Sequence, residues 1–181
     1  MKYISFFFTL LHLVSFGQEY VILPTTGRID LTYKSETDSF VDSYTAIQKV
    51  RPFNTFVLRI RTYSWNTVDT ALFRQDEINF YATSLTSDDD YIEIPRTPKV
   101  GQTWYNGDSS WVYSIKRINA ELKTPNQHYL NLVELEAKNR NKKYKNYYES
   151  YLNYYCKGIG FVASVIDDKL NCYLTNRKIV K

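Results

Sequence analysis

Apolar and polar side chains alternate along much of this chain, and this two-residue period predicts β-strands. The clearest case is residues 55–64, where one face would carry Phe56, Leu58 and Ile60 and the other would carry Arg59 and Arg61. Such a strand is typical of a sheet with one packed face and one wet face. No run of a dozen residues after position 17 shows a convincing helical stripe. We therefore expect a mainly β protein with the arginines on the wet face.

Other segments repeat the pattern and are separated by residues that favour turns. Further strands are expected over residues 20–23, 29–34, 71–74, 78–84, 91–94, 111–116, 129–137 and 144–155, with a final hairpin over 158–176. Residues 39–50 are ambiguous, because Phe40, Tyr44 and Ile47 have helical spacing. A short helix before Pro52 is the alternative there to a strand, which the pattern slightly favours.

The final hairpin can be aligned residue by residue. A turn at Asp167-Asp168 pairs Ile166 with Lys169 and places Ala163 opposite Cys172. Apolar residues then share one face of both strands, as expected of a real hairpin. The members of that face are Ile159, Phe161, Ala163, Val165, Leu170, Cys172 and Leu174.

The strands follow one another closely, which predicts an antiparallel curved sheet in a meander arrangement, as a sandwich or a partly open barrel. A polar run at residues 86–90, followed by Pro95 and Pro98, interrupts the pattern near residues 86–98. This break could subdivide the chain. A connection within one sheet system is favoured, since each side alone is too short to bury much surface.

The first seventeen residues resemble a secretory leader, with Lys2, an apolar run over 3–14, and small residues at Ser15 and Gly17. Cleavage is expected between Gly17 and Gln18, which leaves residues 18–181 as a single β-rich domain. The apolar run is shorter than the roughly 20 residues that a membrane-spanning helix needs, and no second run follows. We expect a secreted or periplasmic protein without a transmembrane segment in its mature chain.

The composition agrees with strands, because 17 Tyr and 10 Phe suit half-buried sheet surfaces. The leader contains one Lys and no acid, so the net charge of +4 would fall to +3, too little to indicate a nucleic-acid partner. The two cysteines, Cys156 and Cys172, would meet oxidising conditions after export. The predicted hairpin register places Cys156 seven residues from the partner of Cys172, which disfavours a disulfide. A bulge at Gly158-Ile159-Gly160 could bring them together.

Four stretches of the second half are similar to a loose group of small secreted or lipid-anchored bacterial β-rich proteins of uncharacterised function. They are residues 98–104 (PKVGQTW), 111–113 (WVY), 129–134 (YLNLVE) and 154–162 (YYCKGIGFV), within a resemblance that covers about residues 91–176. The resemblance implies an envelope or extracellular location and a curved antiparallel sheet. It implies no catalytic residues. The chain departs from the group in lacking a lipid-attachment Cys and in a longer insertion after Trp104.

Candidate catalytic and metal-binding residues are few. His128 is the one histidine of the expected mature chain, and its place ahead of a strand favours a surface residue over a general base. Asp88-Asp89-Asp90 could hold Ca²⁺, but consecutive acids converge poorly on one ion, and a solvated turn is favoured. We expect no cofactor, no metal and no catalytic residue, and a noncatalytic protein is favoured over an enzyme.

Aromatic residues form the best candidate binding surface, because tyrosine and tryptophan faces stack on sugars and partner side chains. The residues are Tyr147, Tyr151, Tyr155, Trp104 and Trp111. A glycan, a protein or an apolar ligand could bind there; packing of one strand face is the structural alternative. The sequence favours a noncatalytic binding or structural protein. A carrier of an apolar ligand in a sheet cavity and an extracytoplasmic hydrolase remain alternatives.

Overall fold

The computed structural model describes residues 20–21, 24, 26–51, 54–83, 90–141 and 149–180, and these residues form twelve β-strands and no helix. The mainly β fold is therefore confirmed. The strands are β1 (Arg28–Ser35), β2 (Ser39–Arg51), β3 (Asn54–Tyr63), β4 (Val68–Gln75), β5 (Asn79–Thr83), β6 (Asp90–Pro95), β7 (Thr103–Tyr105), β8 (Trp111–Lys123), β9 (His128–Asn139), β10 (Ser150–Cys156), β11 (Gly160–Ile166) and β12 (Lys169–Val180).

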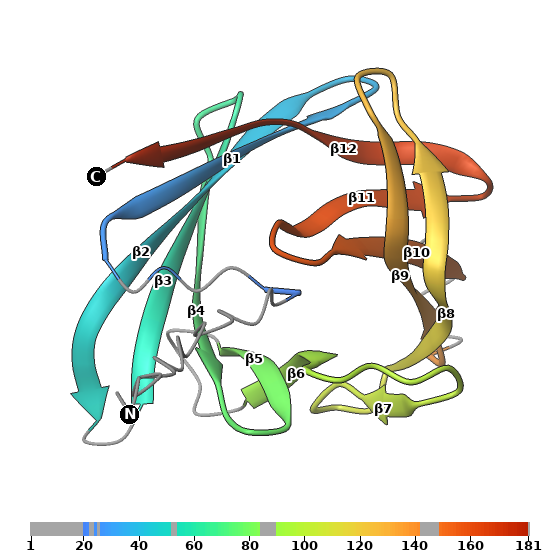
Figure 1. Cartoon of the computed structure of the whole chain (residues 1–181), viewed down its shortest axis with the longest axis horizontal. Helices are drawn as coiled ribbons and strands as arrows, with labels where there is room; N and C mark the ends of the chain where they lie inside the picture. Colours follow the sequence, from blue (N-terminus) through green and yellow to red (C-terminus); the bar gives the residue numbers. More distant parts are fainter. Residues whose placement is uncertain are drawn as a thin grey trace, which may run out of the picture.

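All twelve strands belong to one antiparallel sheet that curves into a nearly closed barrel (Figure 1). The order across the sheet is β6-β5-β4-β3-β2-β1-β12-β11-β10-β9-β8-β7. Each strand pairs with the next one along the chain, as expected of a meander, except that β6 and β7 lie at the two edges of the sheet. Of the two arrangements expected, a sandwich and a partly open barrel, the structure has the barrel.

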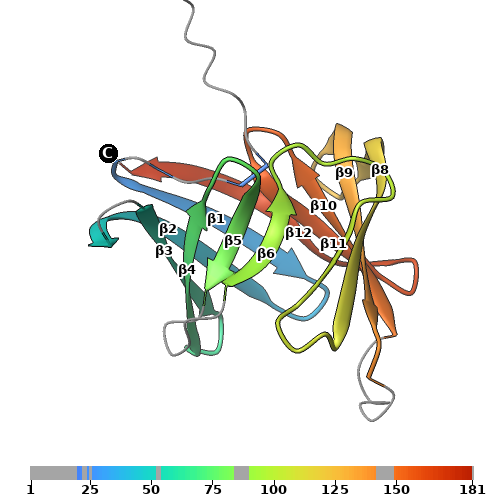
Figure 2. The same cartoon turned by 90° about the horizontal axis from the view of Figure 1, so that it is seen from below.

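The first and last strands lie side by side in the middle of the sheet. Arg28 of β1 pairs with Val180 of β12, and the pairing continues to Ser35 and Cys172 with one irregularity after Thr32. Strands β1–β6 extend from this pair to one edge, and β12–β7 extend to the other. In Figure 2, β4, β5 and β6 lie together, and β8 and β9 lie at the far side of the molecule. Both halves of the chain thus contribute to one continuous sheet.

The barrel has a seam where β6 and β7 end the sheet. The seam is bridged by a side chain, because the indole Nε1 of Trp104 donates a hydrogen bond to the carbonyl oxygen of Ile92 at 2.9 Å. Residues 96–102 connect the two edges. Gly101 has a φ of +84° in this connection, a conformation that side chains disfavour. The predicted break near 86–98 falls partly on this connection; residues 84–89 lie outside the described part.

Most predicted strands are present, with a few differences. Residues 39–50 lie in β2, so the alternative of a short helix is wrong. Tyr20 and Val21 form a bend rather than the start of a strand, and Val21 is buried. Within the predicted strand 144–155, residues 144–148 lie outside the described part.

The final hairpin has the predicted turn but not the predicted register beyond it. Ile166 pairs with Lys169 as expected, and both Asp167 and Asp168 have positive φ. A bulge between Ser164 and Val165 then shifts the pairing, so that Cys172 lies opposite Ser164 rather than Ala163. The prediction assumed an unbroken ladder, and one inserted residue displaces every later pair.

The apolar core lies between both halves of the sheet. Strand β1 shows the simplest pattern, because Ile29, Leu31 and Tyr33 are buried at every second position. Strand β9 is buried continuously from Leu132 to Leu135, which shows that both of its faces are covered there. These side chains belong to one cluster that includes members from both halves.

Candidate ligand-binding cavity

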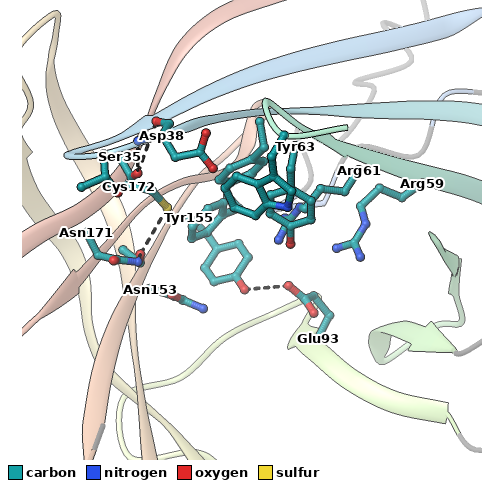
Figure 3. Close-up of a pocket in the computed structure, with 15 residues that line it drawn as sticks. Ser35, Asp38, Arg59, Arg61, Tyr63, Glu93, Asn153, Tyr155, Asn171 and Cys172 are labelled. Atoms are coloured by element: carbon teal, nitrogen blue, oxygen red, sulfur yellow. Dashed lines mark hydrogen bonds between the residues drawn. The ribbon is translucent and has the colours of Figure 1, made fainter. Parts of the chain in front are cut away.

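A cavity of about 510 Å³ opens inside the barrel and is bordered by strands from both halves of the chain (Figure 3). We call it the arginine compartment. Arg59 and Arg61 approach it from β3, Glu93 from β6, and Asn153 and Tyr155 from β10. The remaining lining residues are Ser35, Thr37, Asp38, Phe40, Tyr63, Trp65, Phe161, Ser164, Asn171 and Cys172.

A second cavity of about 380 Å³ adjoins the first, and we call it the tyrosine compartment. Both compartments share Glu93, Asn153 and Tyr155 as lining residues. The others in the tyrosine compartment are Tyr91, Ile92, Asn106, Asp108, Tyr113, Leu135 and Tyr151. Each cavity lies in the range of about 300–1,000 Å³ that is typical of small-molecule sites.

Strand β3 brings its arginines inside, which reverses the expected orientation. Arg59 and Arg61 line the cavity, whereas Leu58 and Ile60 lie on the opposite face of the strand and are only partly buried. The expectation that the arginine face is wet and outward is therefore wrong. The reversal is possible because acidic partners occupy the same inner face on the neighbouring strands.

Asp42 and Arg61 form an ion pair with two hydrogen bonds inside the barrel. Nε and one terminal nitrogen of Arg61 each donate to a different oxygen of Asp42 at 2.7 Å, and Asp42 is 1% exposed. The guanidinium lies 4.3 Å from the ring centroid of Phe40. Burial would lower the pKa of Arg61, but the hydrogen bonds and charge of Asp42 outweigh it and raise that pKa above its ordinary value.

Arg59 is held less completely. One terminal nitrogen donates to Asp69 at 2.8 Å, and the guanidinium lies 5.5 Å from the ring centroid of Phe73. Its buried Nε has no hydrogen-bond partner among the described residues. Arg59 therefore makes fewer side-chain hydrogen bonds than Arg61 in the described structure.

Aromatic rings line one side of the arginine compartment. Tyr63 and Trp65 stack with ring centroids 4.8 Å apart and an interplanar angle of 14°. Trp65 is 60% exposed, so this stacked pair is open to solvent. Phe40 stacks on Tyr33 with centroids 4.8 Å apart.

Glu93 and Tyr155 line both compartments, and their side chains point toward each other (Figure 3). The Tyr155 hydroxyl donates to Oε1 of Glu93 at 2.8 Å. Burial, and next the negative charge of Glu93, raise the pKa of Tyr155 well above its ordinary value. Burial likewise raises the pKa values of Tyr113 and Tyr151. These tyrosines stay uncharged at neutral pH.

No protein-family model, curated protein or solved structure matches the chain.

Of the predicted binding residues, Tyr151 and Tyr155 line the tyrosine compartment. They face the barrel interior instead of an outer surface, and Tyr155 is 2% exposed. Trp104 and Trp111 pack against tyrosines of the compartment. The ring centroids of Trp104 and Tyr113 lie 5.8 Å apart, and those of Trp111 and Tyr151 lie 5.2 Å apart. Tyr147 lies outside the described residues.

The other candidate residues lie away from the cavity or take structural roles. His128 is 55% exposed at the start of β9, and its Nε2 lies 3.6 Å from Glu121. Asp90 accepts hydrogen bonds from Arg74 and Thr83, whereas Asp88 and Asp89 are outside the described part. Among the residues that the structure describes, no three His, Cys, Asp or Glu side chains gather as metal ligands would.

The cysteines are both free thiols. Cys156 ends β10 and is partly buried, whereas Cys172 is buried beside Ser164, with 3.3 Å between Sγ and Oγ. Burial raises the pKa of each thiol, which favours the unreactive protonated form.

Sequence reasoning missed Arg59, Arg61, Glu93 and Asn153 as cavity residues. A signal existed for the arginines, since two positive charges two residues apart on a strand share a face and require partners if that face is buried. No local pattern identifies Glu93, because only closure of the barrel brings β6 near β10.

Proposed function

We propose that this chain is a noncatalytic binding protein that holds a small polar ligand inside its barrel. The observation that carries the proposal is the pair of adjoining cavities that share Glu93, Asn153 and Tyr155. Their walls combine hydrogen-bond donors, acceptors and aromatic faces, as binding sites for small molecules do.

A polar ligand is favoured over an apolar one by the charges in the wall. An apolar molecule would remove water from Arg59 and Glu93 without replacing its hydrogen bonds, and such burial is costly. A ligand with its own donors and acceptors avoids this cost. A noncatalytic role is supported by the exposed position of His128, away from the cavity, and by the raised pKa values of both thiols.

Ligand screening with a cavity-filling variant tests the proposal. The full mature chain would be screened by thermal unfolding against sugars, amino acids, amines and organic acids. A ligand at about 100 times its Kd stabilises the folded state by about 2.7 kcal/mol. We expect at least one such ligand, and we expect Asn153→Trp, which fills the junction of the compartments, to abolish the stabilisation.

Asn176→Trp serves as the matched control, because Asn176 is exposed on β12. It should leave the ligand effect unchanged. Circular dichroism would confirm that both variants keep their sheet. Equal stabilisation in wild type and Asn153→Trp would place the ligand outside the barrel and overturn the proposal, and turnover of a bound compound would overturn its noncatalytic part.

An envelope or extracellular location is also proposed, supported by the leader-like residues 1–17 and by the resemblance of residues 91–176. The described part of the chain contains no helix long and apolar enough to cross a bilayer. Intact mass of the protein purified from its source should correspond to a chain that begins at Gln18. Recovery of the uncut chain from the cytosol would contradict the proposed export.

A further inference from the structure

We infer that the tyrosine compartment binds the ammonium group of a small organic cation, with Glu93 as its counter-ion. The inference rests on the proposed function and specifies which chemistry one end of the ligand carries.

Tyrosine side chains form much of the wall of the compartment. Four tyrosines, Tyr91, Tyr113, Tyr151 and Tyr155, supply ring faces and hydroxyl groups. A cation near the face of an aromatic ring is attracted by the ring quadrupole, and cages of several rings bind alkylated ammonium groups in this way. Because Tyr113, Tyr151 and Tyr155 are uncharged at neutral pH, they keep both their ring faces and their hydroxyl hydrogens.

The charged residues around the compartment favour a cation. Glu93 and Asp108 both line the compartment, and its described lining includes no Lys, Arg or His. Glu93 accepts a hydrogen bond at Oε1 from the neutral hydroxyl of Tyr155, and no ion pair of Glu93 occurs among the described residues. Carboxylates in the wall repel an anionic ligand and attract an ammonium group.

The arginine compartment differs from the tyrosine compartment in the charged residues that line it. There, Arg61 is paired with Asp42 and Arg59 with Asp69, so each positive charge already has a carboxylate. The two compartments meet at Asn153 and Tyr155, where a polar body attached to the ammonium group can continue into the arginine compartment. The cavity thus has a cation-binding end and a hydrogen-bonding end.

Wall geometry also depends on a small residue next to the compartment. A Cβ atom added to Gly107 would lie 2.8 Å from Cε1 of Tyr91, so the ring occupies space that any larger residue would need. Asn106 and Asp108, on either side of Gly107, both line the compartment. The Tyr91 ring is therefore held close to the 106–108 turn.

Choline and its neutral isostere 3,3-dimethyl-1-butanol are the matched probes, because they have nearly the same shape and differ in charge. Binding to the full mature chain would be measured by titration with NMR detection. We expect choline to bind at least tenfold more tightly than the alcohol and to shift resonances of Tyr91, Tyr113 and Tyr151. Equal affinity for the two probes, or shifts confined to other parts of the barrel, would overturn the inference.

Glu93→Gln removes the charge while keeping an oxygen that can accept the Tyr155 hydrogen bond. We expect choline affinity to fall at least tenfold in this variant and to stay unchanged in Glu121→Gln, a matched control at an exposed position of β8. Tyr91→Leu, which removes one ring of the compartment, provides a second variant should Glu93→Gln fail to fold. Unchanged choline affinity in the folded variants would reject the inferred site.

The two proposals fail in different ways. Ligands that bind wild type but not Asn153→Trp, with no preference for choline over its isostere, would leave the binding function standing and reject the cation site. No cavity-dependent ligand of any class would reject both.

Discussion

Asp42 and Arg61 show why a charged residue can be kept inside this barrel. A buried ion pair repays its desolvation only when its geometry is good, and the two parallel 2.7 Å hydrogen bonds satisfy this condition. Stacking of Arg61 over Phe40 covers the remaining guanidinium face. The pair therefore holds β2 and β3 together beside the cavity.

Removal of one partner should be far more damaging than removal of both. Asp42→Ala leaves Arg61 charged and partly buried, so we expect a loss of about 3–5 kcal/mol in the free energy of unfolding, measured with urea. The double variant Asp42→Leu with Arg61→Met should recover most of that loss.

Asp69→Ala provides the comparison, because Asp69 is 54% exposed and its pair with Arg59 is worth about 0–1 kcal/mol. A loss for Asp42→Ala no larger than for Asp69→Ala would show that burial does not amplify the Asp42 pair.

At this scale the sequence predicted part of the site. Tyr151 and Tyr155 were identified because aromatic residues were expected to bind ligands, and both line the cavity. Arg59 was assigned to the wet face because a lone strand gives no information about the acids on its neighbours. The cavity face is recognised only when the neighbouring strands are known. Asp42 on β2 and Asp69 on β4 both pair with Arg61 on β3.

The turn of the β11–β12 hairpin sets the pairing of the two residues beside it, Ile166 and Lys169. Its two-residue turn has φ values of +48° at Asp167 and +60° at Asp168. Positive φ at both positions is the signature of a type I′ turn, which favours Asn followed by Gly. Asp tolerates this conformation but retains steric strain.

Replacement of the turn by Asp167→Asn with Asp168→Gly should therefore stabilise the protein by about 0.5–1 kcal/mol in denaturant unfolding, since Gly adopts positive φ without a Cβ clash. Asp168→Ala should change stability in the opposite direction. A stabilising Ala variant would contradict the strain argument.

Element types were predictable, whereas the bulges were not. Alternation identifies strands such as β3 and β8 from a single segment, but the shift between Ser164 and Val165 has no local sequence signal. Bulges also interrupt β1–β12, β10–β11 and β8–β9. They bend strands so that the sheet can close, and this is a requirement of the whole barrel rather than of any one segment.

Several tyrosines are buried among the residues that the structure describes, and this gives the whole molecule a characteristic pH response. Burial is the largest cause that raises the pKa values of Tyr33, Tyr44, Tyr151 and Tyr155. Unfolded tyrosines lose their protons near pH 10. The folded state therefore retains protons that the unfolded state loses, and stability should be fully present below about pH 10 and fall as pH rises above it.

Tyrosinate absorbance followed together with denaturant unfolding measures this effect. We expect the buried tyrosines to titrate only as the protein unfolds. Tyr44→Phe should make the alkaline loss of stability less steep, whereas Tyr105→Phe, at a position 53% exposed, should not. Titration of all tyrosines in one step without unfolding would contradict the buried arrangement.

The pairing of β1 with β12 makes assembly of the sheet depend on a contact between strands far apart in the sequence. Among the described strands, β1 is synthesised before the others and its neighbour β12 after them. Until residues 169–180 are available, one edge of β1 has no partner, and strands β1–β6 have no ladder to strands β7–β11. Unpaired strand edges invite aggregation. The central strand pair thus delays the joining of the two halves until β12 has been made.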